Sequence, residues 1–452
     1  MRYLPLSDAD RSDMLRVIGA GSIDELFRDV PEELRLKDPI AGLPMHASEM
    51  AVERHMAALS RKNMVAGDVP FFLGCGAYRH HVPASVDHII QRGEFLTSYT
   101  PYQPEIAQGT LQMMFEFQSQ VARLFGCEVA NASMYDGSTA MWEAILMAHR
   151  ITRRNKTLIS SGVHPHYVGV ATTMAKFSED QLETSLPELD AETDAEALID
   201  RIDDSTSAVV VQYPDILGRI TDLTPIAEAA HAAGALLIAV VTEPVALGLI
   251  KSPGEMGADI VVGEGQSIGV GLQFGGPYVG LFACREKHVR QMPGRLAGET
   301  VDAEGKRGFV LTLSTREQHI RREKATSNIC TSSVLCALAF TAHLTLLGEK
   351  GLRQLASLNH ARACEAAERL AAIPGASLVN DSFFNEFTLR LPVEARPAVH
   401  AMVEKGVLGG VSLGRLYPGV EALKNGLVIA VTETTTDEDV AALEAALKEV
   451  VQ

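Results

Sequence analysis

Residues 259–269 read Asp-Ile-Val-Val-Gly-Glu-Gly-Gln-Ser-Ile-Gly, a short apolar run followed by a glycine-rich loop. The run Asp259–Val262 has the length of a buried strand, and the glycines predict a loop at its carboxyl end. Four further runs of this kind are Thr157–Ser161, Ala208–Tyr213, Ala235–Val241 and Tyr278–Ala283. Helical patterns such as Leu223–Ala233 lie between several of them. Apolar strands that alternate with helices predict an α/β fold with a mainly parallel sheet covered on both faces.

The sequence on either side of this sheet divides the chain into three predicted parts. Residues 1–130 read as a helical N-terminal segment with interface loops, in which Ser7 or Asp8, and later Ser48, can cap helices. Residues 131–331 form the large α/β domain. Residues 332–452 begin with a long linking helix and continue as a smaller α+β domain. The predicted elements of this last domain are strand Ser382–Leu391, helix Ala398–Lys405, strand Leu427–Thr432 and helix Asp437–Val450.

The composition limits the classes of partner. The 452-residue chain has 40 basic and 57 acidic residues, a formal net charge of −17, which disfavours binding to nucleic acid or to an anionic membrane. No stretch reaches the ~18 unbroken apolar residues of a membrane span, and the N-terminus lacks the apolar core of a secretion signal. We therefore expect a cytoplasmic protein. The cysteines form no Cys-x-x-Cys pair, and no carboxylate or cysteine accompanies the histidines at ligand spacing, so we expect no metal site.

A turn of small polar residues, Gly137-Ser138-Thr139, precedes a helical pattern that continues through Trp142. Free N–H groups at a helix N-terminus, together with two hydroxyls, suit a phosphate group. The same residues also fit an ordinary helix cap, in which Ser138 or Asp136 accepts hydrogen bonds from the first turn. The sequence leaves both interpretations open.

The loop after Asp259–Val262 resembles the part of aspartate-aminotransferase-type pyridoxal-phosphate enzymes that carries the Schiff-base lysine. Gln266 stands at that place here. The nitrogen of a carboxamide is delocalised into its carbonyl, so Gln266 cannot form an imine with the aldehyde of the cofactor. We therefore predict no catalytic residue at this position.

In such enzymes a neighbouring strand ends in an aspartate that pairs with the pyridinium nitrogen. Strand Ala235–Val241 is followed here by Thr242 and Glu243, so Glu243 is either a candidate for that role or a solvent-facing strand end. Three lysines read more simply as solvated charges than as imine formers: Lys156, Lys251 and Lys324. An independent pyridoxal-phosphate enzyme with an unorthodox lysine such as Lys251 is the alternative function.

Longer motifs spread over the chain carry a family resemblance. They are Phe72–Gly76, His81–Pro83, Thr100–Gly109, Asn131–Ala140, Gly265–Ser267, Phe274–Tyr278, Arg316–Arg322, Lys324-Ala325 and Ser327–Ile329. Together they resemble the glycine dehydrogenase (decarboxylating) P-protein family of the glycine cleavage system. Within it they are similar to subunit 1, the amino-terminal half in organisms that split the P-protein into two chains.

The resemblance implies a fold of pyridoxal-phosphate type I and a role in glycine decarboxylation. In this family the P-protein passes the aminomethyl group of glycine to the lipoyl arm of the H-protein, and the T-protein and L-protein complete the system. In the split form the cofactor belongs to subunit 2. This chain is therefore expected to bind no pyridoxal phosphate covalently, to form a heterodimer or a dimer of heterodimers with subunit 2, and to be inactive alone. The candidate cofactor residues Gly137, Ser138, Thr139 and Glu243 would be vestigial.

An aromatic and proline-rich loop, Tyr99–Glu105, has neither a helix nor a strand pattern. Active sites of this fold form at a dimer interface, so we hypothesise that the loop shapes the cleft of the catalytic subunit. The candidate residues are Tyr99, Tyr102, Gln103 and Glu105. The alternatives are a loop packed on its own large domain and a chain that serves only as a docking module for the H-protein.

Overall fold

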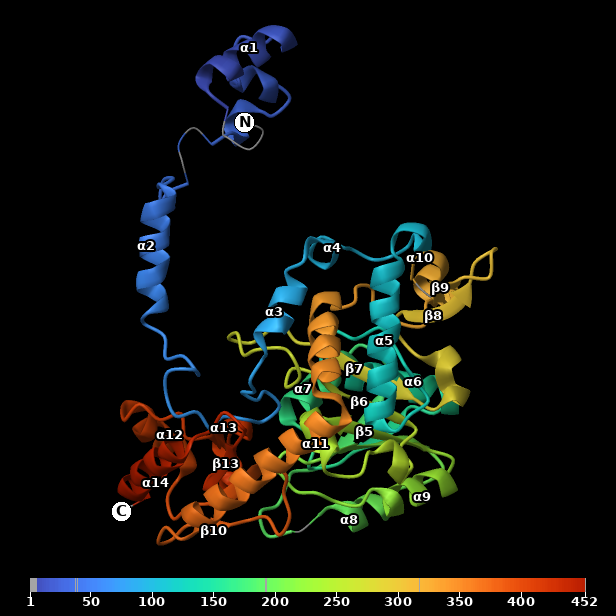
Figure 1. Ribbon diagram of the computed structural model, residues 1–452, viewed down its shortest axis with the longest axis vertical. Helices are drawn as coiled ribbons and strands as arrows, with labels where there is room; N and C mark the ends of the chain where they lie inside the picture. The colour runs from blue at the N-terminus through green and yellow to red at the C-terminus, as the bar shows by residue number, and fades with distance from the viewer. Residues whose placement is uncertain (1–5, 37, 39, 192, 317, 452) are drawn as a thin grey trace. The chain divides into compact units, whose positions relative to one another are not determined.

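The computed structural model describes residues 6–36, 38, 40–191, 193–316 and 318–451. Two compact units make up the chain, Met1–Met64 and Val65–Gln452, and each is described by itself (Figure 1). Among the described residues, no helix is long and apolar enough to cross a membrane.

The first unit consists of helices joined by irregular chain. Its helices are α1 (Asp8–Ile18), η1 (Asp24–Phe27), η2 (Glu32–Leu34) and α2 (Glu49–Ser60). The predicted caps are confirmed: Ser7 and Asp10 form a capping box on α1, and the Ser48 hydroxyl accepts a hydrogen bond from the N–H of Ala51 in α2. None of the described residues in these four helices is buried. The apolar side chains of these helices are therefore not packed in a hydrophobic core.

A seven-stranded sheet lies at the centre of the second unit. Its strands are β1 (Val129–Ala130), β2 (Lys156–Ile159), β3 (Gln181–Thr184), β4 (Thr206–Gln212), β5 (Leu236–Val241), β6 (Ile260–Glu264) and β7 (Gly280–Cys284). Their order is β1-β7-β6-β5-β4-β2-β3, and the neighbours from β3 to β6 are parallel. Only β7 runs antiparallel to its neighbours β1 and β6. The predicted mainly parallel α/β sheet is confirmed.

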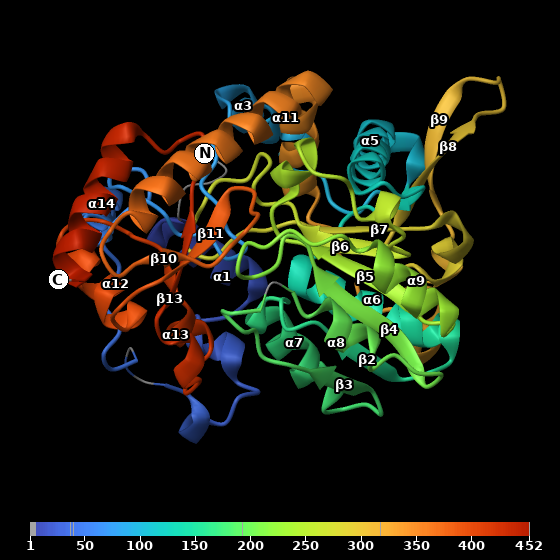
Figure 2. The same cartoon turned by 90° about the horizontal axis from the view of Figure 1, so that it is seen from below.

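Helices cover both faces of this sheet, because successive side chains on a buried strand point to opposite faces. Val209 and Leu237 face a core shared with α5 (Gln108–Phe125), α9 (Thr224–Ala232) and α11 (Val334–Ala371). Val210 and Ile238 face a second core shared with α6 (Gly137–Thr152) and α7 (Pro165–Ala175). Figure 2 shows α5 and α11 on one side of β6 and β7, with α6 and α7 on the other. The shorter connecting helices are α3 (Ala84–Ile90), α4 (Gly93–Leu96), η3 (Pro104–Ile106), α8 (Ala195–Ile199), η4 (Pro244–Gly248), η5 (Gly254–Met256), η6 (Glu286–Gln291), η7 (Ser314–Arg316), α10 (Gln318–Arg321) and η8 (Arg322–Lys324).

The C-terminal part has its own four-stranded antiparallel sheet and its own core. The sheet order is β10-β11-β13-β12, with β10 (Ser377–Leu378), β11 (Glu386–Arg390), β12 (Val411–Ser412) and β13 (Gly426–Ala430). Its helices are α12 (Ala395–Glu404), α13 (Leu413–Leu416), η9 (Glu421–Leu423) and α14 (Asp437–Val451). Helices α12 and α14 pack with the second half of α11 around Phe387, Leu389 and Ile429, whereas α13 and η9 pack in a smaller cluster with Leu217 and Val428. The predicted alternation of strand and helix in this region is confirmed.

Two features differ from the sequence pattern. The long helix α11 is interrupted at Gly348, whose φ of 59° and ψ of −175° are not helical. A hairpin of β8 (Leu296–Val301) and β9 (Arg307–Thr312) packs on α5, although the apolar runs in its half-exposed strands are only two or three residues long. These features lie away from the strand ends that carry the candidate site.

Candidate functional site

The candidate cofactor residues converge at the carboxyl edge of the parallel strands. Glu243 follows β5 and Gln266 follows β6, and these two strands are neighbours in register, with Val241 opposite Gly263. The turn that starts α6 lies at the same edge, because the N–H of Gly137 donates a hydrogen bond to Glu264 at the end of β6. This edge is where open α/β sheets bind their ligands.

Gln266 is fully buried, and its carboxamide is occupied by the protein itself. Its Oε1 accepts a hydrogen bond from the N–H of Tyr78 (2.8 Å), and its Nε2 donates to the carbonyl of Tyr78 (3.0 Å) and to that of Val270 (2.7 Å). The side chain is thus held against the main chain of a distant loop. It has no amine to offer an aldehyde, and both ends of its amide are satisfied.

Glu243 is buried as well, and it pairs with a histidine. Its Oε2 lies 3.0 Å from Nε2 of His80, and the other ring nitrogen, Nδ1, lies 2.8 Å from Oε2 of Glu433. Oε1 of Glu243 accepts the N–H of Val245 at 3.1 Å. Burial alone would lower the pKa of His80, but the two carboxylates outweigh it and raise that pKa to about 10. His80 is therefore an imidazolium whose two N–H groups donate to two carboxylates.

Carboxylates also occupy the start of α6. Asp136 caps the helix, with Oδ1 accepting the N–H of Thr139 at 2.7 Å and the hydroxyl of Ser138 at 2.8 Å. The N–H of Gly137 donates to Oε2 of Glu264 at 3.1 Å. Burial raises the pKa of Glu264 to about 8, while the backbone N–H groups that it accepts oppose that rise. The helix-cap interpretation of this turn describes these contacts, because Asp136 and Glu264 already accept the N–H groups of Thr139 and Gly137 that a phosphate would need.

The loop that meets Gln266 and Glu243 is Gly74–His81, which we call the plug. Oε1 of Glu386 accepts the N–H of Cys75 at 2.6 Å, and Oε2 of the same carboxylate accepts the hydroxyl of Tyr78 at 2.9 Å. The carbonyl of Cys75 accepts Nε2–H of His164 at 2.9 Å. Burial raises the pKa of Glu386 to about 7. The motifs Phe72–Gly76 and His81–Pro83 overlap the two ends of this loop, but the sequence gave no sign that Glu386 and Glu433 would contact it.

Pyridoxal phosphate does not fit the residues of this cleft. The cavity lined by Glu243, Tyr78 and Glu386 has a volume of about 10 Å³, room for roughly one water molecule. A Cβ placed on Gly137 would collide with the hydroxyl of Tyr167, so the space at the start of α6 is also filled. Glu243, Gln266 and the N-terminus of α6 are the groups that could hold the cofactor, and each of them is hydrogen-bonded within the chain.

The three lysines considered from the sequence lie elsewhere. Lys251 is exposed and lines a different hollow, of about 730 Å³, together with Arg123 and Glu255. Lys156 forms an ion pair with Asp203 at 2.8 Å, and Lys324 is exposed at the end of η8. Among the described residues, no group of three or more His, Cys, Asp or Glu side chains is placed to hold a metal ion.

The loop Tyr99–Glu105 is separate from the cleft and largely exposed. Tyr99 is 74% exposed and Tyr102 is 52% exposed, and Gln103 and Glu105 are exposed too. Nη2 of Arg295 donates to the Tyr102 hydroxyl at 2.8 Å, and the guanidinium carbon lies 5.4 Å from the centre of the tyrosine ring. The loop lines a hollow of about 600 Å³ together with residues such as Phe95 and Thr110.

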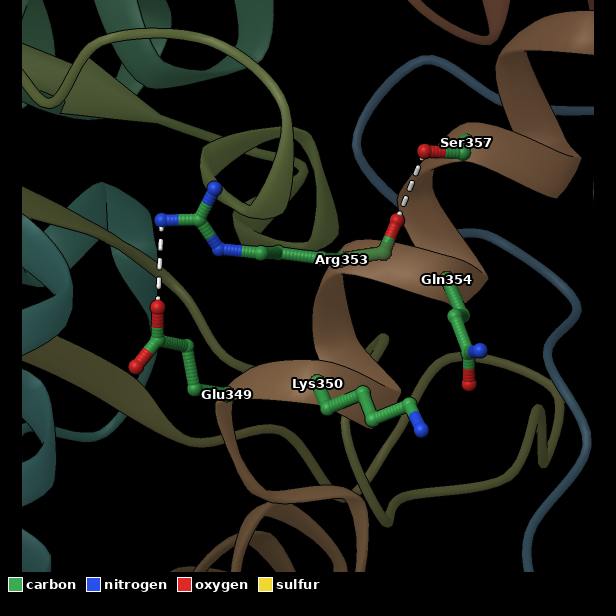
Figure 3. Close-up of a pocket in the computed structure, with 5 residues that line it drawn as sticks. All are labelled: Glu349, Lys350, Arg353, Gln354 and Ser357. Atoms are coloured by element: carbon green, nitrogen blue, oxygen red, sulfur yellow. Dashed lines mark hydrogen bonds and ion pairs between the residues drawn. The ribbon is translucent and has the colours of Figure 1, made fainter.

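A further hollow, of about 530 Å³, lies along α11 and does not gather chemically reactive groups (Figure 3). It is lined by Glu349, Lys350, Arg353, Gln354 and Ser357. Arg353 pairs with Glu349 at 3.1 Å, and the Ser357 hydroxyl donates to the Arg353 carbonyl at 2.8 Å. These are neighbours one turn apart on a single helix, as expected for a solvated helix face.

Comparisons with known proteins agree over the whole chain. The family model described as glycine cleavage system P-protein matches residues 1–447. A protein of Sphingopyxis alaskensis named probable glycine dehydrogenase (decarboxylating) subunit 1 is 76% identical, with 100% of both chains covered. A protein of the same name from Xanthobacter autotrophicus is 64% identical, again over 100% of both chains.

Solved structures extend this likeness to the fold. The crystal structure of a glycine decarboxylase (P-protein) of the glycine cleavage system, in inhibitor-bound form, has a TM-score of 0.91 and 44% identity, with 100% of both chains covered. A glutamate decarboxylase of Lactobacillus brevis has a TM-score of 0.67 at 15% identity, covering 93% of this chain and 97% of that one. The architecture is therefore the pyridoxal-phosphate type I fold, as predicted.

Proposed function

The chain belongs to the P-protein family of the glycine cleavage system, and on that basis we propose that it is the cofactor-free subunit of a two-chain glycine decarboxylase. One observation carries the proposal: Gln266, at the end of β6 where we expect the Schiff-base lysine of this fold, is buried and hydrogen-bonded to the Tyr78 main chain. The partner is the related subunit 2, in a heterodimer or a dimer of heterodimers in the cytoplasm. Pyridoxal phosphate in that partner supplies the electron sink for loss of the glycine carboxyl group.

The test of this division is reconstitution from separate chains. Each chain alone is expected to show no glycine decarboxylation, and a mixture of the two is expected to restore it. The lipoyl arm of the H-protein is the proposed acceptor of the aminomethyl group, with the T-protein and L-protein acting afterwards. Full activity of subunit 2 without this chain would contradict the proposal. Binding of the H-protein by this chain alone, without any effect on subunit 2, would favour the docking-module alternative.

Two regions of this chain supply the proposed interface with subunit 2. The first is the N-terminal unit, whose helices α1 and α2 bury none of their described residues. On α2, Val52, Met56 and Leu59 follow the i, i+4, i+7 spacing of one helix face and are 48%, 57% and 42% exposed. Exposed apolar faces of this kind mark protein–protein contacts.

The second region is the loop Tyr99–Glu105, which we propose completes the cleft of subunit 2. Tyr102 is held in place by Arg295 yet keeps half of its surface exposed, so it is positioned without being part of the core. Tyrosines of this sort supply large contact area at low entropic cost. The nearby Ile106, 83% exposed, extends the same apolar surface.

The Tyr102→Ala variant is expected to lower glycine–bicarbonate exchange by the assembled enzyme about 10- to 100-fold, because loss of a cleft wall misplaces the bound substrate. The complex should remain intact. Phe177→Ala is a matched control, since this aromatic side chain is 89% exposed after α7 and has no proposed role. Unchanged exchange by an intact Tyr102→Ala complex would remove the loop from the active site.

A further inference from the structure

We propose that the plug, Gly74–His81, is a built-in ligand of the vestigial cofactor cleft, in which the His80 ring takes the place of a pyridinium on Glu243. The site formed by Glu243 and Glu433 is thus a binding site for a flat, aromatic N–H cation, filled by the chain's own histidine. This inference rests on the cleft of this chain and does not depend on the proposed role beside subunit 2.

The chemistry of the His80 ring matches that of a protonated pyridine. Both are flat aromatic cations with an N–H donor in the ring plane, and both are matched by a carboxylate in a buried site. Nε2 of His80 lies 3.0 Å from Glu243, and Nδ1 lies 2.8 Å from Glu433. The side chains of His80 and Glu243 are 1% and 3% exposed. The raised pKa of His80, about 10, is consistent with this arrangement.

The amide of Gln266 secures the same segment where a covalent bond would otherwise hold a cofactor. It binds both the N–H and the carbonyl of Tyr78, which gives a two-point contact with one residue. The plug also needs a glycine at its start. A Cβ on Gly74 would collide with the carboxylate of Glu386 and come within 2.6 Å of the Cβ of Ala430. The plug therefore fits the cleft closely both at Gly74 and at Tyr78.

The plug contacts the large domain and the C-terminal sheet region at once. Gln266, Glu243 and His164 hold it from the side of the parallel sheet. From the C-terminal part, Glu433 accepts the N–H of His81 at 2.7 Å and the Thr432 hydroxyl donates to the carbonyl of Arg79 at 2.6 Å. The built-in ligand thus also fixes one domain against the other.

The test is chemical rescue of the His80→Ala variant of the full chain. Removing the ring leaves a space of imidazole size between two carboxylates. The melting temperature of the variant is expected to fall by about 5–10 °C, and added imidazole at pH 6.5 should restore at least about half of that loss. Pyridine, present partly as pyridinium at pH 5.5, should act in the same direction. His400→Ala, an exposed histidine on α12, is the control and should not respond to either compound.

A response of His80→Ala no larger than that of His400→Ala or of the unsubstituted chain would overturn the proposal. A second measurement needs no substitution, and it decides the question if His80→Ala fails to fold. In the unsubstituted chain with ¹⁵N-labelled histidine, nuclear magnetic resonance should show both ring nitrogens of His80 protonated at pH 8. A neutral His80 ring at that pH would refute a cation in this site.

Discussion

Met56→Glu is expected to separate this chain from subunit 2. Met56 lies in the middle of the exposed apolar face of α2, between Val52 and Leu59. Burying a carboxylate without a partner in an interface costs about 3–5 kcal/mol, so the dissociation constant should rise about 100-fold or more. Decarboxylation should fall in parallel at protein concentrations near the original dissociation constant. Sedimentation velocity on mixtures of the two chains would measure the loss of the complex.

Ala58→Glu supplies the matched control for this experiment. It adds the same charge to the same helix, but Ala58 points about 130° away from the centre of the apolar face at 100° per residue. Its complex should form as in the unsubstituted protein. Equal association of the Met56→Glu and Ala58→Glu chains would show that the face does not touch subunit 2. Circular dichroism of each chain would confirm that α2 is still folded.

Alkaline pH is expected to destabilise the chain through His80. In the folded protein the pKa of His80 is about 10, raised from 6.5, so the imidazolium stabilises the fold fully below pH 6.5. That contribution is lost as the pH rises through about 10, and it should amount to about 3–5 kcal/mol of unfolding free energy. Denaturant titrations between pH 7 and 11 would measure it.

The groups around His80 decide how this pH dependence is interpreted. Glu243 and Glu433 face the ring directly, His81 adjoins it in sequence, and His343 approaches from α11 with a pKa lowered to about 4, mainly by burial. The carboxyl groups of Glu386 and Glu264, with pKa values raised to about 7 and about 8, titrate at lower pH than His80. The His80→Gln variant keeps both glutamates, so its profile should be flatter than that of the unsubstituted chain between about pH 6.5 and about pH 10. Identical profiles in that range would contradict the role given to His80.

The parallel sheet could be predicted because its strands are buried on both faces and read as unbroken apolar runs. The hairpin β8–β9 could not, because only the first two residues of β8 and Phe309 in β9 are buried. The antiparallel direction of β7 could not be predicted either, because an apolar run indicates the length of a strand but not its direction. Pairing with β6 sets that direction through the turn around Gly275–Pro277.

The candidate site was predictable only in part, and for a physical reason. The inability of Gln266 to form an imine follows from its functional group alone. Its partner Tyr78 is 188 positions away, and Glu433 is 353 positions from His80, so no local pattern connects them. The sequence therefore predicts what the cleft lacks, whereas the fold is needed to see that a segment of the same chain fills it.

The central claim is that this chain provides a closed, cofactor-free cleft and that the chemistry belongs to its partner. Borohydride reduction of the assembled enzyme in the presence of pyridoxal phosphate, followed by peptide mass mapping, tests this most directly. The account predicts a reduced pyridoxyl adduct on one lysine of subunit 2 and none on this chain. A stoichiometric adduct on any lysine of this chain, including Lys251, would contradict it.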